Sequence, residues 1–429
     1  MSDPSKKLGL LTLASLVIAN MIGAGVFTTS GFALADLGSP KWVMLGWLVG
    51  GLIAICGALS YGGLVRHLTE SGGEYLFLAR FIHPVVGFLA GWVSLLAGFT
   101  GATAFAALGL ETYLSFLRPA WLPSGAIAIG SVLLFTALHS FRLALGAVAQ
   151  NAIVLLKLVL LVVFLVIVGF SPSANTAPHP VAPFSLLAFA GSLVWISLSY
   201  SGFNAAIYIA DEAKDARRNV PRALWLGTLI TMFFYLALNA VFVYLPPFQT
   251  VVGQPDVAAA AAQAIGGEKL AAFIRVIIAL ALCTSVSSMI MAGPRVYARM
   301  ANDGVFPRMF RFTGEVPRAA ILLQSALVIL VILVSSLKGL LGYLGLTLSL
   351  CTALTVSSIF VVRRKEALNV TGYPFTPVLY VGAVLVFAAL SLKRNPWEML
   401  GTVLTVASGL CAYWLINRRK PAGSKGAFN

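Results

Sequence analysis

The stretch Met21–Phe27, with the sequence MIGAGVF, lies in the middle of an apolar run at residues 10–34. Two glycines this close together weaken a helix and expose its backbone amides. A helix interrupted inside a membrane presents free N–H groups and the positive end of a half-helix, which both favour a bound carboxylate. Small residues also let two helices pack closely, so the motif alone is equally consistent with a packing contact.

A second stretch of this kind, Ser199–Asn204 with the sequence SYSGFN, lies in the middle of the apolar run at residues 185–210. Carbonyl groups freed by a helix break can accept hydrogen bonds from an ammonium group. The alternative is a glycine kink whose polar groups are satisfied by neighbouring helices. The two stretches occupy matching places if the chain is a five-plus-five repeat, and such pairs indicate the central site of a secondary transporter.

The composition independently indicates a membrane protein. Of the 429 residues, 59% are hydrophobic and 10% are charged, and the mean hydropathy is +0.93. A soluble domain cannot bury that much apolar surface. In lipid the backbone needs internal hydrogen-bond partners, which leaves helices and closed barrels, and the apolar runs lack the alternation of barrel strands. The predicted fold class is therefore an all-α integral membrane protein.

Twelve runs are long enough to cross a bilayer as helices, which takes about 20 apolar residues. They cover residues 10–34, 42–65, 85–110, 123–139, 146–170, 185–210, 223–245, 271–298, 319–337, 340–362, 375–392 and 397–416. The loops between them are short, so residues 1–429 are predicted to form a single transmembrane domain. The stretch 246–270 could hold a small helix on the outer face, and Ser171–Pro183 is predicted to be an external linker.

The net charge of +15 comes from 29 Lys and Arg against 14 Asp and Glu. The basic residues lie in short loops, which is typical of the positive-inside rule and argues against a nucleic-acid partner. With both termini in the cytoplasm, only seven basic residues lie in outer segments: Lys41, Arg118, Lys269, Arg275, Lys338, Lys393 and Arg394. We therefore expect a multi-pass protein of the plasma membrane, or of the inner membrane in a bacterium, with cytoplasmic N- and C-termini.

The four cysteines, Cys56, Cys283, Cys351 and Cys411, all lie inside apolar runs without CxxC spacing. They resemble small hydrophobic residues rather than metal ligands or a disulfide framework. We expect no metal site and no cofactor.

Lys157 lies near the middle of the fifth span, too deep for its ammonium group to reach the interface easily. A charge at this depth costs roughly a few kcal/mol or more and indicates function by default. The alternative is a structural tether that binds backbone carbonyls at the break in the first span. The two are compatible, because a tether that loses its proton can couple transport, so Lys157 is the candidate proton-coupling residue.

Four motifs follow one another along nearly the whole chain. They are GAGVF at 23–27, SGGEY at 71–75, SGFN at 201–204 with DEAKDARRNVPRA at 211–223, and RVYARMANDGVFP at 295–307. Together they resemble the amino acid permeases of the amino acid–polyamine–organocation (APC) superfamily. The resemblance implies a LeuT-like fold with discontinuous helices 1 and 6, inverted repeats at 8–170 and 185–362, and two additional helices at 375–416.

The resemblance also implies a substrate site at the two breaks. In relatives the substrate carboxylate meets first-span amides, here those around Ala24 and Gly25, and the ammonium meets carbonyls of both breaks. The predicted substrate-binding residues are Met21, Ile22, Gly23, Ala24, Gly25, Leu198, Tyr200, Ser201, Gly202, Phe203 and Asn204, with Trp195 nearby. Asn204 departs from many permeases, which carry an acidic residue there, and is closer to L-type exchangers. No free Asp or Glu appears deep in any span, which favours a small neutral substrate.

The resemblance further bears on coupling. Sodium-coupled members of this fold hold an ion between spans one and eight, where many permeases place a lysine from span five. Sodium ligands are available in this chain at Thr284, Ser285, Ser287 and Ser288. A fixed ammonium repels Na⁺, however, so proton coupling or obligatory exchange is preferred.

We therefore expect secondary active transport of small neutral L-amino acids by alternating access, as a proton symporter or an exchanger. The expected partners are the amino acid, protons and the lipid bilayer. A cationic amino acid or polyamine antiporter, a channel and a transport-silent sensor stay open as alternatives. A membrane enzyme is disfavoured, because the sequence has no HExxH, no GxSxG and no pair of intramembrane carboxylates.

Overall fold

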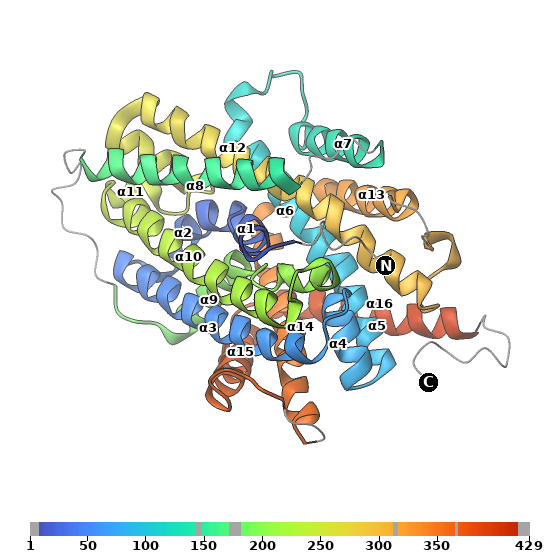
Figure 1. Cartoon of the computed structure of the whole chain (residues 1–429). Coiled ribbons are helices and arrows are strands. Elements are labelled where there is room, and N and C mark those ends of the chain that lie inside the picture. The colour runs from blue at the N-terminus through green and yellow to red at the C-terminus, as the bar shows by residue number, and fades with distance from the viewer. Residues whose placement is uncertain (1–7, 142–146, 171–181, 312–315, 365–367, 419–429) are drawn as a thin grey trace.

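The computed structural model describes residues 8–141, 147–170, 182–311, 316–364 and 368–418, and this part of the chain is a bundle of helices (Figure 1). The first half contains α1 (Leu10–Met21), α2 (Ala24–Leu37), α3 (Pro40–His67), α4 (Gly73–Phe81), α5 (Pro84–Val93), the π-helical η2 (Ser94–Gly101), α6 (Ala102–Leu114), α7 (Ala126–Ser140) and α8 (Ala147–Gly169). The second half contains α9 (Leu186–Tyr200), the 3₁₀-helical η4 (Ala205–Glu212), α10 (Ala216–Tyr244), α11 (Phe248–Val251), α12 (Val257–Asn302), α13 (Arg318–Val334), α14 (Leu337–Val362), α15 (Phe375–Arg394) and α16 (Pro396–Arg418).

Ten of the described helical segments are long and apolar enough to cross a membrane, and two shorter apolar helices cover Ala126–Ser140 and Arg318–Val334. These segments occupy the places of the predicted spans, so the all-helical class is confirmed. The stretch 246–270 holds α11 and the first part of α12, which is interrupted at Gly266 and Gly267. Both chain ends and most of the predicted linker Ser171–Pro183 lie outside the described residues.

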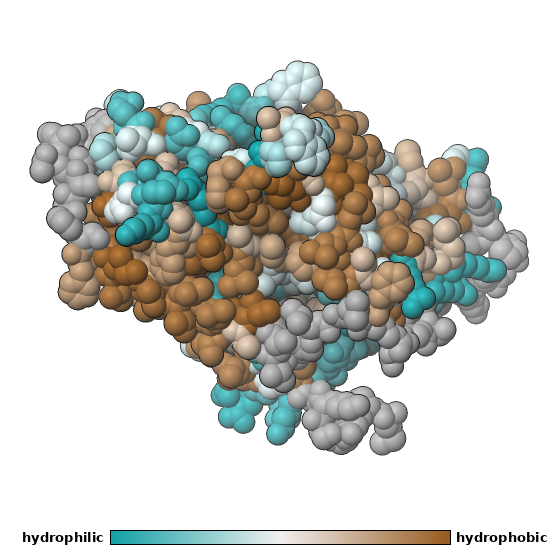
Figure 2. All heavy atoms as spheres, turned by 90° about the horizontal axis from the view of Figure 1, so that it is seen from above, coloured by the Kyte–Doolittle hydropathy of each residue, from teal (hydrophilic) through white to brown (hydrophobic). Residues whose placement is uncertain are grey.

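The outer surface of the bundle is strongly apolar. Large side chains such as Leu134, Phe233 and Leu404 are each more than half exposed. Figure 2 shows hydrophobic residues over much of one face, with hydrophilic residues gathered toward its margins. Exposing such a surface to water would be unfavourable, whereas contact with lipid is not, so we expect these side chains to face lipid.

Helices α4 and α11 lie at opposite ends of the bundle (Figure 1). We call the end that carries Leu8, α4 and the C-terminal end of α12 the N-terminal face, and the other end the α11 face. Leu8 joins the segment after η4 through two backbone hydrogen bonds, from Leu8 N to Glu212 O and from Lys214 N to Leu8 O, each 2.9 Å long. This clasp is an isolated parallel bridge between Leu8 and Ala213.

Candidate functional site

The first predicted break is present. Helix α1 ends at Met21, Ile22 leaves the helical conformation with ψ 84°, and α2 begins at Ala24. Gly23 is the N-cap of α2, and no side chain caps this helix end. The first amides of α2 therefore keep their hydrogen-bonding capacity and the positive end of the helix for a bound anion.

The second break follows the same plan. Helix α9 ends at Tyr200, Ser201 is extended with ψ 147°, and η4 begins only at Ala205. Gly202 has φ +100°, a conformation that L side chains rarely adopt, and it packs against the backbone of Asn20. The carbonyl groups of the last turn of α9 are thereby released from regular helical pairing.

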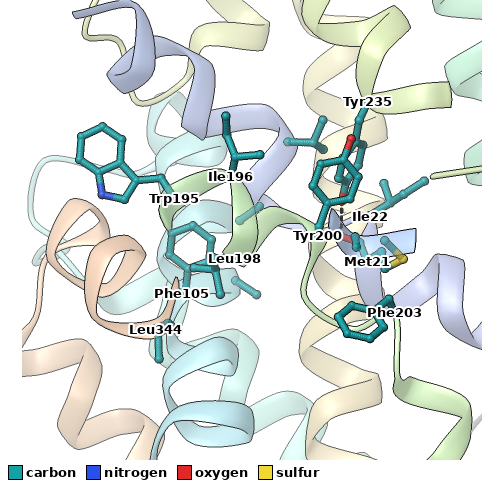
Figure 3. Close-up of a cluster of buried hydrophobic side chains, with 14 of the residues drawn as sticks. Met21, Ile22, Phe105, Trp195, Ile196, Leu198, Tyr200, Phe203, Tyr235 and Leu344 are labelled. Atoms are coloured by element: carbon teal, nitrogen blue, oxygen red, sulfur yellow. Dashed lines mark hydrogen bonds between the residues drawn. The ribbon is translucent and has the colours of Figure 1, made fainter. Parts of the chain in front are cut away.

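Tyr235 of α10 connects the two breaks (Figure 3). Its hydroxyl lies within hydrogen-bond distance of Met21 O and, at 2.8 Å, of Ser199 O. One hydroxyl proton serves one acceptor at a time, so the side chain can alternate between the breaks. Sequence reasoning missed this residue, because its hydroxyl is one of several polar groups in the span, beside those of Thr228, Thr231 and Asn239.

Lys157 of α8 is fully buried, and its Nζ donates a hydrogen bond to Ile22 O over 3.1 Å. The ammonium group therefore reaches the first break, as both the tether and the coupling hypotheses require. A buried donor satisfies a carbonyl that the interrupted helix leaves unpaired.

Both breaks open into one cavity of about 440 Å³. Of the predicted substrate-binding residues, eight line it: Met21, Gly23, Ala24, Gly25, Leu198, Ser201, Gly202 and Asn204. The cavity continues past Thr12 and Arg295 to Leu8 and Glu212, and so reaches the N-terminal face. Its size lies within the usual range for small-molecule sites.

Three predicted residues do not line this cavity. Ile22 is fully buried and contributes its carbonyl to Lys157. Tyr200 and Phe203 instead border a separate small hollow beside Tyr380. Trp195 points away from the breaks (Figure 3), and the Lys338 ammonium lies 5.6 Å from the centre of its ring.

The α11 face of the site is closed by close packing. Thr29 and Ser199 form a hydrogen bond of 3.0 Å between α2 and α9. A Cβ atom on Gly25 would lie 2.5 Å from Ser199 Oγ, and one on Gly31 would strike the backbone of Gln254. Gly25 therefore allows α2 and α9 to pack closely and also lines the cavity. The close-packing interpretation of the first motif and the binding-site interpretation are compatible.

A buried carboxyl lines the cavity from an element that sequence reasoning treated as a loop. Glu74 of α4 is 4% exposed and accepts hydrogen bonds from Tyr61 at 2.6 Å and from Asn204 at 2.9 Å. The π-helical segment η2 adds Ser94, Gly98 and Phe99 to the lining. Its wide turns are typical of functional positions within transmembrane helices.

The candidate sodium ligands have partners inside the protein. The hydroxyls of Thr284 and Ser285 both donate to Ala281 O, and that of Ser288 donates to Ser285 O. Ser287 pairs with His139 of α7 at 2.9 Å and so faces away from the first break. Lys157 reaches this break with its own charge, which disfavours a second cation there.

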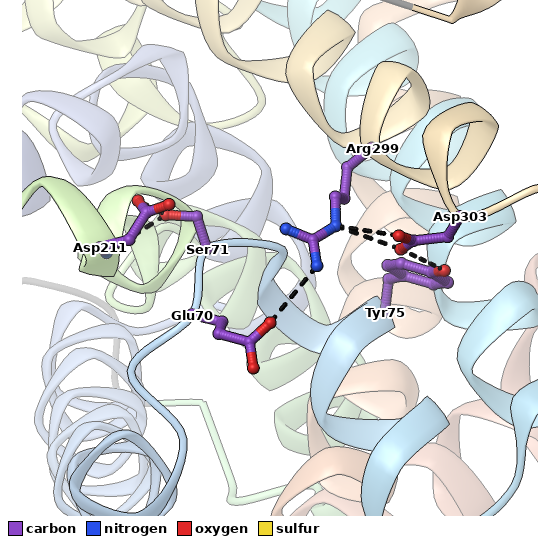
Figure 4. Close-up of polar contacts among 6 residues, drawn as sticks. All are labelled: Glu70, Ser71, Tyr75, Asp211, Arg299 and Asp303. Atoms are coloured by element: carbon purple, nitrogen blue, oxygen red, sulfur yellow. Dashed lines mark hydrogen bonds and ion pairs between the residues drawn. The ribbon is translucent and has the colours of Figure 1, made fainter. Parts of the chain in front are cut away.

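Polar contacts join elements on the N-terminal face (Figure 4). Arg299 of α12 pairs with Asp303 at 3.2 Å and with Glu70, in the segment before α4, at 3.3 Å. Tyr75 donates to Asp303 at 2.9 Å, and Ser71 donates to Asp211. The pairs are partly exposed, so each contributes roughly 1 kcal/mol or less, but together they fix α4 beside the cavity.

Known proteins share this sequence pattern. A family model described as "Amino acid permease" matches residues 8–409. The serine/threonine exchanger SteT of Bacillus subtilis is 25% identical, over 97% of this chain and 98% of its own length. The b(0,+)-type amino acid transporter 1 of Mus musculus is 23% identical, over 96% of this chain and 88% of its own. The human large neutral amino acids transporter small subunit 2 is 26% identical, over 84% and 70%.

Proposed function

Because the chain belongs to the amino acid permease family, a family of amino acid transporters, we propose that it moves small neutral L-amino acids across the plasma membrane by alternating access. It is a multi-pass membrane protein. The proposal includes twelve membrane-spanning helices in a LeuT-like arrangement of two inverted five-helix repeats, with both termini in the cytoplasm.

One observation carries the proposal. The uncapped N-terminus of α2 and the released carbonyls of α9 open into the same cavity. An amino acid carries one anionic and one cationic group on the same carbon, so it can satisfy both helix ends at once. The cavity volume of about 440 Å³ suits a small substrate.

The names of the relatives support the neutral class and exchange. One is described as a serine/threonine exchanger and another as a transporter of large neutral amino acids. Lys157 supports coupling, because its ammonium donates to Ile22 at the first break. Loss of its proton would remove the charge and weaken that hydrogen bond, which would change the break at the proposed substrate site. Proton symport and exchange are the two forms of the proposal.

The test is uptake of labelled L-serine and L-alanine into proteoliposomes. We expect saturable uptake that is accelerated either by unlabelled amino acid inside, which indicates exchange, or by an inward proton gradient, which indicates symport. Gly25→Leu should abolish uptake, because the new side chain strikes Ser199 and fills the site. Uptake that stays unchanged in this variant would contradict the proposed site.

Two further variants separate binding from folding. Gly23→Ala adds a methyl group 3.4 Å from Ser285 Oγ, an ordinary contact, so the protein should fold and its KM should rise roughly tenfold. Gly382→Ala places its methyl group in open space on α15, and its uptake should match that of the wild type. Linear, non-saturating flux without acceleration by internal amino acid would indicate a channel instead.

A further inference from the structure

Glu74 is a buried carboxyl to which the proposed function gives no task. The structure inserts α4 between the segment after α9 and α14, and Glu74 lies where these elements meet the cavity. Asn204 and Tyr61 both donate to Oε1, while Oε2 has only the weak donor Cys351 Sγ at 3.6 Å. One oxygen of the carboxyl therefore keeps most of its capacity to accept a hydrogen bond.

The side chains that interact with Glu74 supply no positive charge. The titratable groups that interact with it are Tyr61 of α3, Tyr208 of η4, Cys351 of α14 and Tyr380 of α15. None of these side chains can become a cation. Within the described part of the chain, no lysine or arginine forms an ion pair with Glu74.

A carboxylate in such a place needs compensation. Burial raises the pKa of Glu74, although its hydrogen-bond donors partly oppose this rise. A buried charge without a partner is strongly unfavourable, so the group binds either a proton or a cation. A proton can reach it from the cavity, and so can a cationic group of a molecule that occupies the cavity.

We propose that Glu74 is a specificity-determining residue that binds the ammonium or guanidinium group at the end of a cationic amino acid's side chain. Glu74 carries a proton instead when the substrate is neutral. The inference rests on the proposed function, and it widens the substrate class to lysine-like and arginine-like amino acids. The carboxylate that the spans themselves lack is thus supplied by α4.

The layout of the cavity favours this assignment. The backbone groups of a substrate would bind at the breaks near Gly25 and Ser201, and Asn204 in the second break contacts Glu74 directly. Tyr208, which interacts with Glu74, and Phe99, whose ring packs against Tyr208 at 5.6 Å, both line the cavity and suit the aliphatic part of a long side chain.

Two other charged side chains line the same cavity. Glu212 is bound to the clasp at Leu8, and Arg295 lies one helical turn before Arg299, which pairs with Glu70 on the N-terminal face. Neither side chain is among the groups that interact electrostatically with Glu74. Glu212 is acidic and Arg295 is basic, so together they add no net positive charge to the cavity that could compensate the carboxylate of Glu74.

The experiment measures competition by L-arginine and L-lysine against labelled L-serine uptake, and the thermal stabilisation of purified protein by the same compounds. In the wild type, both cationic amino acids should compete, and more strongly at alkaline than at acidic pH, because they bind the ionised carboxyl. Glu74→Gln keeps the shape and the acceptor for Asn204 but removes the negative charge, so the readout is the affinity for L-arginine relative to that for L-serine. L-arginine should bind at least roughly tenfold more weakly.

Glu111→Gln is the matched control. Glu111 is also a buried carboxyl, but it is bonded to Arg118 and to the amides of Gly125 and Ala128, outside the cavity. Its arginine-to-serine preference should equal that of the wild type. Glu74→Asp, which keeps the charge, should retain part of the arginine binding.

Three results would overturn the inference: no binding of either cationic amino acid to the wild type at any pH, arginine binding that is unchanged by Glu74→Gln, or arginine binding that does not rise with pH in the wild type. The last measurement needs no variant and stands even if Glu74→Gln fails to fold. Absence of serine transport by the wild type would contradict the proposed function instead, whereas arginine stabilisation would still report on Glu74.

Discussion

Lys157 replaces, at Ile22, a hydrogen bond that the interrupted α1 cannot supply. We predict that Lys157→Ala changes the proton dependence of uptake, or the substrate affinity measured from one membrane face, because the break loses a fully buried donor. Initial uptake rates across a pH series, with substrate added to either side, measure both effects. Lys393→Ala, which removes an exposed lysine, should leave them unchanged. An unaltered pH profile in Lys157→Ala would mean that this lysine is only a tether.

Glu74 predicts a pH effect on stability as well as on binding. Burial raises its pKa in the folded protein, so the native state retains a proton that the unfolded chain has already lost. The free energy of unfolding should therefore decrease as pH rises from the unfolded to the native pKa. Glu74→Gln should remove this decrease and unfold at a higher temperature than the wild type on its alkaline side. Equal pH slopes in thermal unfolding of the two proteins would refute the prediction.

The sequence predicts the role of a residue when that role depends on the local backbone. It does not predict a role that depends on contacts with residues far away in the chain. The pairs of glycine and polar residues at Gly23 and Gly202 mark the breaks because glycine acts locally. Tyr235 lies 214 residues from Met21, and Glu74 lies 130 residues from Asn204, so nothing near either residue in sequence signals the contact. Tyr200 and Phe203 were predicted from the resemblance, which involves the carbonyl of Tyr200, and it gave no information on their side chains, which border the second hollow.

Among the elements, the second break depends most on one residue. Gly202→Ala forces a side chain into φ +100° and against the backbone of Asn20, which should cost about 1–3 kcal/mol. We expect a lower unfolding temperature and a higher KM for L-serine. Gly130→Ala is the control, because this α7 glycine has open space around it and the substitution favours the helix. Equal losses in both variants would show that the break is not specially constrained.

The long elements followed from length and hydropathy, because a helix in lipid satisfies its own backbone. Helix α4 could not be predicted from length and hydropathy, because it has only nine residues and follows the positive-φ Gly72. It packs beside the cavity without crossing the bundle. The π-helical turn in η2 was equally hidden. One added residue per turn leaves no periodic trace in a sequence that is apolar on all sides.

At the scale of the whole molecule, we predict that a water-soluble reagent reaches the cavity from the N-terminal face and not from the α11 face. In a variant without native cysteines, Ala292→Cys lines the cavity that reaches the N-terminal face, so a membrane-impermeant thiol reagent should modify it from that side. Bound L-serine should slow the reaction. Ser30→Cys lies at a fully buried position between Trp47 and Asn239, so the reagent should fail to reach it from either side. Modification of Ser30→Cys from the α11 face alone would show that the cavity opens the other way.

The clasp at Leu8 has a mechanical consequence. Because the backbone of Leu8 is bonded on both sides to the strand-like segment around Ala213, the first half-helix and the end of the sixth span are linked as one lever. A movement of one half therefore has either to carry the other half with it or to break these two hydrogen bonds. A molecule that bound to this short paired segment would therefore act on α1 and on the segment after η4 at the same time.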